Sequence, residues 1–170
     1  MRILLASSEV YPYSKTGGLG DAVGALGKAL AAGGHQVGIV TPLYRGIREK
    51  LSGLRRMDWK FDVPLGTKRV TAELLALDIS DNLTIYFVDK PAYFDRAGIY
   101  SENGSDYGDN AERFIFFSKC VVNLSRHLPL KPEVLHLHDW PVGLAALLVQ
   151  HDAKVSAWGS RPREIGRAHV

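Results

Sequence analysis

The chain has 170 residues, of which 46% are hydrophobic and 23% charged, and its formal net charge is +3. These values are ordinary for a globular domain. The scattered, small positive charge argues against nucleic-acid binding, and no apolar run reaches the ~20 residues of a membrane span. The single cysteine, Cys120, rules out an internal disulfide and suits a reducing cytoplasm, with core packing as its expected role. Because the opening apolar run is short and Glu9 follows it, we expect no secretory signal.

The first 40 residues predict a βαβ unit. Residues 2–7 are apolar on both faces, as in a buried parallel strand. A long loop over 8–19 leads to a helix over 20–32, which Gly33-Gly34 ends, and 37–40 form the next strand. Glycines inside a helix cost roughly 1 kcal/mol each relative to alanine. We therefore expect two of them to permit close packing against the sheet, namely Gly24 and Gly27.

The middle of the chain predicts an antiparallel addition to one edge of this sheet. After a basic, irregular stretch with a short helix over 43–56, three β-rich runs alternate with turn residues. The expected strands cover 59–63, 69–77 and 83–88. A segment rich in Gly, Asp, Asn and Tyr follows over 89–110 and predicts an exposed loop.

The remaining elements complete an α/β, Rossmann-like, doubly wound and mostly parallel sheet. Helical periodicity over 109–127, a strand over 133–138 and a helix over 141–151, with Pro141 in its first turn, are expected. We assign residues 1–155 to this one domain. Residues 156–170 have neither periodicity nor an apolar run, and we expect them to be a non-native or disordered tail.

The loop Ser14 to Asp21 predicts an anion site. Glycine lets a backbone take φ > 0 and lets a ligand approach closely, and the following helix N-terminus presents unpaired N–H groups and a positive dipole end. Lys15 adds a full charge beside Gly17 and Gly18. A plain tight turn with a solvated lysine is the alternative. The glycines are displaced from a dinucleotide fingerprint, no acidic residue closes the second strand, and the P-loop spacing is absent.

A second group of polar residues lies at the end of the last predicted strand. His136 and His138 alternate on one strand face, and Asp139 and Trp140 follow at the carboxyl end, where open α/β sheets bind ligands. Two histidines without a third ligand make a metal site improbable. Asp139 as the N-cap of the next helix, with Trp140 in the core, is the alternative.

The segment from Tyr93 to Asn110 combines aromatic rings with short polar side chains. Aromatic faces stack on sugar rings, and Asp, Asn and Arg pair with hydroxyl groups. An ordinary solvated loop is an equal alternative, and Arg113, just beyond, can equally be a structural ion-pair partner.

Several of these motifs resemble one family. Lys-Thr-Gly-Gly-Leu at 15–19, Ser-Glu-Val-Tyr-Pro at 8–12, Gly20-Asp21 and His-Leu-His-Asp-Trp at 136–140 are similar to bacterial glycogen synthases and plant starch synthases over roughly residues 1–150. That resemblance implies the GT-B architecture, two facing Rossmann-like halves, of which this chain resembles part of the first. It also implies a retaining hexosyltransferase of the cytoplasm, or of the plastid in a plant, although no transit peptide is visible.

The resemblance further implies partners and site residues. The expected partners are ADP-glucose, or UDP-glucose, and the non-reducing end of an α-1,4-glucan, with no cofactor, no metal, no nucleic acid and no membrane. Asp139 and Asp21 are the candidate catalytic residues. The expected substrate-binding residues are Lys15, Gly17, Gly18, His138, Trp140, Tyr93, Asn110 and Arg113.

Three alternatives remain open from the sequence. A related nucleotide-sugar glycosyltransferase, such as a sucrose or trehalose-phosphate synthase, would share the fold, although the Lys-Thr-Gly-Gly-Leu match disfavours it. A nicotinamide-dependent oxidoreductase is disfavoured by the displaced glycines. A non-catalytic glucan- or nucleotide-binding module is what the isolated chain would amount to.

Overall fold

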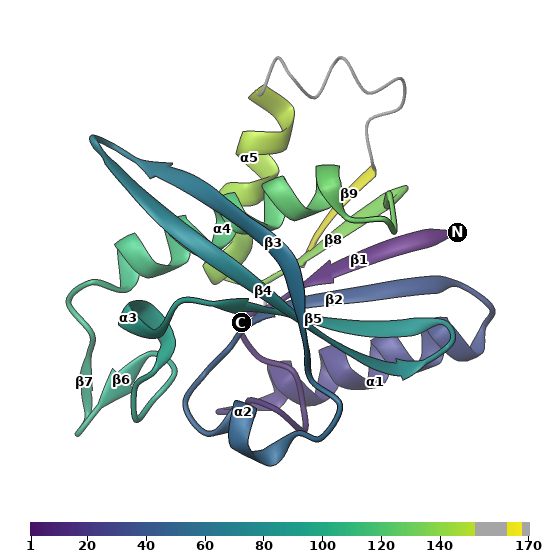
Figure 1. The fold of residues 1–170 in the computed structure, drawn as a ribbon, viewed down its shortest axis with the longest axis horizontal. Helices are drawn as coiled ribbons and strands as arrows, with labels where there is room; N and C mark the ends of the chain where they lie inside the picture. The colour runs from purple at the N-terminus through teal and green to yellow at the C-terminus, as the bar shows by residue number, and fades with distance from the viewer. Residues whose placement is uncertain (152–162, 168–170) are drawn as a thin grey trace.

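The computed structural model describes residues 1–151 and 163–167, which form a seven-stranded mixed sheet flanked by helices (Figure 1). The strands lie in the order β3-β4-β5-β2-β1-β8-β9. Their bounds are β1 Arg2–Ala6, β2 Gln36–Pro42, β3 Arg55–Leu65, β4 Lys68–Ser80, β5 Leu83–Asp89, β8 Val134–His138 and β9 Arg163–Arg167. The helices are α1 Gly18–Ala32, α2 Ile47–Lys50, α3 Pro91–Phe94, α4 Asn110–His127, the 3₁₀ turn η1 Trp140–Val142 and α5 Gly143–His151. Two short strands, β6 Ser101–Glu102 and β7 Ser105–Asp106, form a separate hairpin.

Strand β1 lies at the centre of the parallel half of the sheet. It pairs in parallel with β2 on one side and with β8 on the other, with Ala6 opposite Val40 and Leu137. The chain therefore winds outwards from β1 in both directions, as the doubly wound prediction required. The carboxyl ends of β1 and β8 form the switch point at which such sheets bind ligands.

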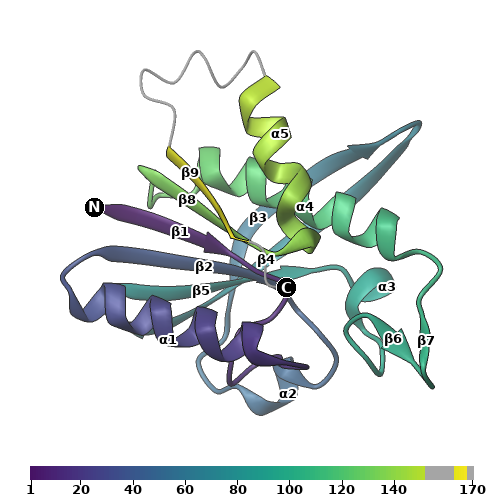
Figure 2. The same ribbon diagram turned by 180° about the vertical axis from the view of Figure 1, so that it is seen from behind.

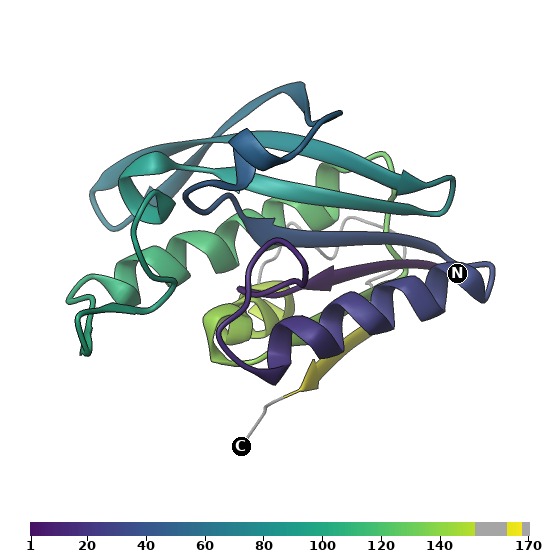
Figure 3. The ribbon, with the colours of Figure 1, turned by 90° about the horizontal axis from the view of Figure 1, so that it is seen from below.

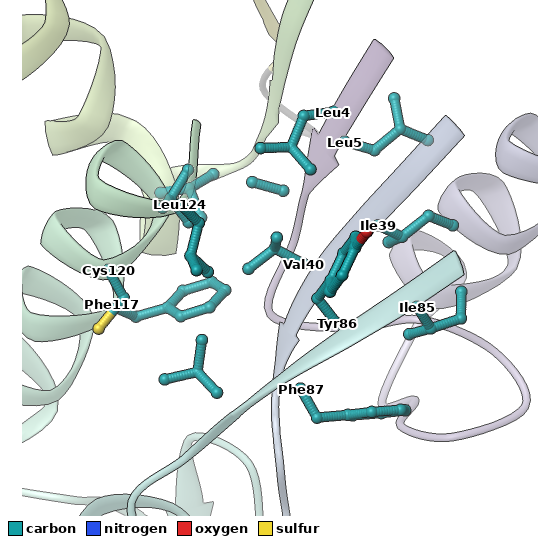
Figure 4. Packing of buried hydrophobic residues seen from close by; sticks show 14 of the residues in the cluster. Leu4, Leu5, Ile39, Val40, Ile85, Tyr86, Phe87, Phe117, Cys120 and Leu124 are labelled. Atoms are coloured by element: carbon teal, nitrogen blue, oxygen red, sulfur yellow. The ribbon is translucent and has the colours of Figure 1, made fainter. Parts of the chain in front are cut away.

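Helices cover both faces of the sheet, with α1 on one side and α4 and α5 on the other (Figure 2). Alternate side chains of the parallel strands pack against the helices on opposite faces of the sheet, because successive residues of a strand point to opposite faces. Leu4 and Val40 face Phe117 of α4, while Leu5 and Ile39 face α1 (Figure 4). All five side chains are at most 1% exposed, so the core is continuous through the sheet. Cys120 is buried in the α4 layer, in accord with its predicted packing role.

The β3–β4 hairpin forms one edge of the sheet. Strand β4 is antiparallel to both β3 and β5, while β5 is parallel to β2, so the predicted antiparallel edge is confirmed. The outer strand β3 carries a register shift between Arg56 and Lys60, and it contains Pro64. Its basic side chains pair with the acids of β4: Arg56 and Lys60 with Glu73, and Arg55 with Asp78.

Two segments differ from the sequence-based expectation. The segment 89–110 is more than an exposed loop, because it contains α3 and the β6–β7 hairpin and buries Tyr93 and Phe94. The pattern-free end contributes β9, which pairs in parallel with β8. Backbone pairing at a sheet edge needs no apolar periodicity, which is why the pattern missed this strand. The other residues of the predicted tail lie outside the described ones.

Within the described residues, no helix is long and apolar enough to cross a membrane.

Candidate functional site

The two motifs singled out by the sequence lie at the same edge of the sheet. The loop that carries Lys15 leaves the carboxyl end of β1, and Asp139 leaves the carboxyl end of the neighbouring strand β8. The segments that follow β2 and β5 gather at this edge too (Figure 3). The strand order therefore places both motifs at the same edge of the sheet, the edge at which open α/β sheets bind ligands.

The shape of the Lys15 loop depends on the buried carboxylate of Glu9, which is 2% exposed. Oε2 of Glu9 accepts hydrogen bonds from the backbone N–H of Thr16 at 2.6 Å and of Gly17 at 3.3 Å. Oε1 accepts from the hydroxyl of Thr16 at 2.6 Å and from that of Tyr100 at 2.9 Å. The carboxylate thereby joins the loop to the segment 95–107.

Lys15 lies at the surface, next to the N-terminus of α1. Its Nζ is 2.5 Å from Oδ2 of Asp21, and it lies 5.7 Å from the ring centroid of Tyr11. The hydrogen bond to Asp21 is the main reason that the pKa of Lys15 is raised, and nearby Tyr11 and Glu9 act in the same direction. Because both partners of the ion pair are about half exposed, the pair adds little to stability. The ammonium group is thus protonated and accessible.

Gly17 and Gly18 have no positive φ. Gly17 is extended, with φ −144° and ψ −156°, so the expected need for a left-handed backbone is wrong here. A Cβ added at either residue would meet no atom within 4 Å. The fold therefore leaves open space over this glycine pair, as the close approach of a ligand to the backbone requires.

The other glycines of α1 serve packing. A Cβ at Gly20 would lie 2.9 Å from the carbonyl oxygen of Ser14, and one at Gly24 would lie 2.6 Å from that of Tyr11. A Cβ at Gly27 would lie 2.5 Å from Cδ1 of Ile39. Hence the predicted close contact with the sheet holds at Gly27, whereas Gly24 contacts the loop instead. The contacts at Gly20 and Gly24 fix the N-terminal half of α1 against the site loop, and the contact at Gly27 fixes the helix against β2.

Asp139 combines a strained backbone with a capping contact. Its φ of 68° and ψ of 175° fall in a region that non-glycine residues rarely adopt, at a cost of order 1–3 kcal/mol. Its Oδ1 accepts a hydrogen bond from the N–H of Trp140 at 2.7 Å, so it is the N-cap of η1, as the capping alternative predicted. Strain of this kind is typical of functional positions, so the cap does not remove Asp139 from the candidates.

Trp140 is exposed, which contradicts the expectation that capping would place it in the core. Its side chain is 57% accessible, and its ring lies 5.0 Å from that of Phe114 and 5.9 Å from that of Tyr100. Tyr100 also donates a hydrogen bond to Glu9, so the cluster of Trp140, Phe114 and Tyr100 connects the carboxyl end of β8 to the Lys15 loop. The exposed indole is a suitable surface for an apolar sugar face.

His138 is the last residue of β8, two positions before Trp140. Its side chain is 1% exposed, and its ring centroid is 4.1 Å from that of His136, on the same strand face as predicted. Among the described residues, no group of three or more His, Cys, Asp or Glu side chains could hold a metal ion. A substrate contact by His138 stays a prediction.

The residues predicted in the segment 93–113 are mainly internal supports. Arg113 is fully buried and donates to the carbonyls of Tyr93 at 2.7 Å and Ile99 at 3.0 Å, and to Oδ1 of Asn110 at 2.6 Å. Burial lowers its pKa. Asn110 donates in turn to the carbonyl of Tyr100 at 2.8 Å.

Tyr93 is also buried, and its hydroxyl donates to Oε1 of Glu112 at 2.5 Å. Its pKa is raised to about 12, mainly by burial. Arg113, Asn110 and Tyr93 thus hold the segment that positions Tyr100. Their direct contact with substrate stays a prediction.

Sequence reasoning missed Glu9 and Tyr100 as parts of the site. Two signals pointed to Glu9: it lies in the Ser-Glu-Val-Tyr-Pro motif at 8–12, and it is an acid close after an apolar strand, where burial requires partners. No local pattern could show that Tyr100, 91 residues away, supplies one of them.

Comparisons with known proteins agree with this geometry. A family model described as the starch synthase catalytic domain matches residues 2–161. A glycogen synthase of Syntrophotalea carbinolica is 40% identical over 168 residues, which is 99% of this chain and 34% of that protein. A glycogen synthase of Anaeromyxobacter sp. (strain K) is 43% identical over 155 residues, covering 89% of this chain and 31% of that protein.

Among solved structures, the chain is similar to the catalytic domain of starch synthase IV from Arabidopsis thaliana bound to ADP and acarbose. The TM-score is 0.78 at 27% sequence identity, covering 98% of this chain and 33% of that one. The chain therefore spans about a third of the length of the curated relatives it matches.

Proposed function

Because this chain belongs to the starch synthase catalytic domain family, we propose that it is the N-terminal part of a glycogen or starch synthase. The complete enzyme would transfer glucose, with retention, from ADP-glucose to the non-reducing end of an α-1,4-glucan. The observation that carries this proposal is the open Gly17–Gly18 surface next to the accessible ammonium of Lys15. The ADP and acarbose bound to the plant neighbour support a nucleotide donor and a glucan acceptor.

The chemistry at this site would be electrostatic. When the glucosyl group leaves the donor, negative charge grows on the nucleotide diphosphate, and preorganised positive groups stabilise that charge. Lys15 and the first-turn N–H groups of α1 would meet the diphosphate. The N–H groups of Thr16 and Gly17 already donate to Glu9, so they are turned away from it.

The two candidate catalytic carboxylates would serve different steps. Asp139, held with a strained backbone beside the exposed indole of Trp140, is placed for hydroxyls of the glucosyl group or the acceptor. Asp21 pairs with Lys15 at 2.5 Å, so its direct effect would be on the orientation of that ammonium. The site carboxylates and their loops would be supported from the interior by buried or partly buried residues, namely His138, Tyr93, Asn110 and Arg113.

Substitution of Lys15 in the complete enzyme tests the proposal. A hydrogen bond from a charged group is worth a factor of roughly 10 to 150 in affinity. Lys15→Gln should therefore raise the donor KM by a factor in this range and leave the KM for glucan unchanged. Lys15→Arg keeps the charge with different geometry and should recover part of the loss.

The matched control is Lys28→Gln, because Lys28 lies on α1 and forms no ion pair within residues 1–151 and 163–167. Unchanged donor KM and kcat in Lys15→Gln would remove this lysine from the site. A preference for UDP-glucose over ADP-glucose in the same assay would correct the proposed donor.

A non-catalytic glucan- or nucleotide-binding module remains the second candidate for the isolated chain, because the chain spans only about a third of its relatives. For the complete enzyme we propose a cytoplasmic location, by analogy with its bacterial relatives. Immunolocalisation of the complete protein would test it.

A further inference from the structure

The charge arrangement around Glu9 is unusual for a loop at the surface. The carboxylate is almost fully buried, yet it lies directly beneath four consecutive exposed residues, Lys15 to Gly18. Burial of an unpaired carboxylate is very costly. Here its two oxygens accept four hydrogen bonds, two from backbone N–H groups and two from hydroxyls.

Two of these hydrogen bonds hold the backbone N–H groups of Thr16 and Gly17, which join the Lys15 loop to α1. Thr16 follows Lys15 directly, and Gly17 is the N-cap of α1. With both N–H groups fixed on one carboxylate oxygen, the Cα of Lys15 and the first turn of α1 have a set relative position. Hydrogen bonds to an ionised group are shorter and stronger than neutral ones, as the 2.6 Å distances to Thr16 illustrate.

The fourth hydrogen bond fixes Glu9 itself. Tyr100 donates to Oε1 of Glu9 and also lies 2.7 Å from Oγ of Ser8. Burial raises the pKa of Tyr100 well above its usual value, so its hydroxyl stays protonated and available as a donor. The Tyr100 ring packs at 5.8 Å from Phe114, which is anchored in α4. The loop is therefore held through Glu9 to the core.

We infer that Glu9 is a positioning residue, which holds the Lys15 loop in the shape that receives an anionic diphosphate. The inference rests on the proposed function. Glu9 would act without contacting the ligand, by keeping Lys15 and the first-turn N–H groups of α1 on one side of the loop. Loss of the carboxylate would release Thr16 and Gly17, and their N–H groups would compete for other acceptors.

The test uses the 170-residue chain with inorganic pyrophosphate as the probe. Amide hydrogen exchange at Thr16 and Gly17, pyrophosphate affinity from NMR shifts, and the melting temperature are measured for the wild type and each variant. Glu9→Ala should accelerate exchange at both amides and weaken pyrophosphate binding, each by roughly tenfold or more. Glu133→Ala is the matched control, because Glu133 is an exposed acid at the opposite edge of the sheet, where it accepts from the N–H of Arg2.

Glu9→Gln is the conservative variant and should restore most of both properties. Its amide oxygen can accept from the two N–H groups, while its NH₂ group donates to the hydroxyls of Thr16 and Tyr100, which can accept as well as donate. If Glu9→Ala does not fold, Tyr100→Phe removes a single hydroxyl and should cause smaller changes of the same sign. A merely structural role would lower the melting temperature without a selective loss of pyrophosphate affinity.

The outcomes separate the two claims. If the wild type binds pyrophosphate and Glu9→Ala binds it equally well, the positioning role is wrong and the proposed function stands. Unchanged exchange at Thr16 and Gly17 in Glu9→Ala overturns the positioning role as well. If the wild type itself shows no binding at millimolar pyrophosphate, the anion site of the proposed function fails, and the inference that rests on it fails too.

Discussion

The glycines of α1 divide into two groups that substitution should separate. A methyl group added at Gly18 would enter open space, whereas one added at Gly24 would lie 2.6 Å from the carbonyl oxygen of Tyr11. The fold therefore has room for a side chain at Gly18 but none at Gly24. If the open space over Gly18 exists for a ligand, Gly18→Ala should damage binding and Gly24→Ala should damage stability.

The magnitudes follow from these contacts. Overpacking costs about 1–3 kcal/mol, and the obstacle at Gly24 is backbone, which cannot rotate away. Alanine gains about 1 kcal/mol over glycine in a helix, so Gly24→Ala should lower the free energy of unfolding by up to about 2 kcal/mol. Gly18→Ala meets no obstacle and should leave that free energy unchanged or raise it by up to about 1 kcal/mol. If its methyl group displaces one charge-assisted hydrogen bond to a phosphate, affinity should fall roughly 10- to 150-fold.

Urea denaturation and pyrophosphate titration of the same two variants measure these effects. The opposite pattern, with Gly18→Ala unstable and Gly24→Ala as stable as the wild type, would refute the packing argument. Equal pyrophosphate affinity in Gly18→Ala and the wild type would show that no ligand approaches the backbone there.

Three further outcomes are expected. This chain alone should transfer no glucose from labelled ADP-glucose to glycogen, because it spans about a third of its relatives, and measurable incorporation would contradict that. The hydrogen bond from Arg96 lowers the pKa of Asp109 below its ordinary value, so this carboxylate stabilises the fold above about pH 4 and loses its effect as the pH falls through the lowered pKa. The melting temperature of Asp109→Asn should therefore lie below that of the wild type at neutral pH and approach it in acid, and a gap independent of pH would exclude this cause. Burial raises the pKa of the Cys120 thiol well above its usual value, so a thiol reagent should label it only in denaturant, and rapid labelling of the native chain would contradict its place in the core.

Much of the fold could be predicted because its signals are local. Apolar runs, helix-ending glycines and turn residues lie within a few positions of one another, and they predicted β1, α1, β2 and α4 within one or two residues. The sheet edge that carries the site followed from parallel-strand geometry alone. The prediction failed where stability comes from backbone pairing with a distant strand, as in β9.

The candidate site was less predictable for the same physical reason. Lys15 and Asp139 are recognisable from their neighbours in the chain, but burial decides the roles of Arg113, Tyr93 and His138, and burial depends on contacts across the molecule. The same residue types that pair with sugars at a surface also hold loops together inside a protein. Only the structure assigns Arg113 three acceptors in the segment 93–110.

The outer strand β3 also determines whether a strand of another molecule can pair with this edge of the sheet. An edge strand exposes unpaired backbone groups that invite a strand of a second molecule to join. In β3, Pro64 removes one donor, the register shift between Arg56 and Lys60 breaks the regular spacing, and basic side chains line the margin. A second copy approaching along this strand would find one backbone donor missing and the regular spacing of the others interrupted. This margin of the sheet is thereby protected against intermolecular strand addition, even at high protein concentration.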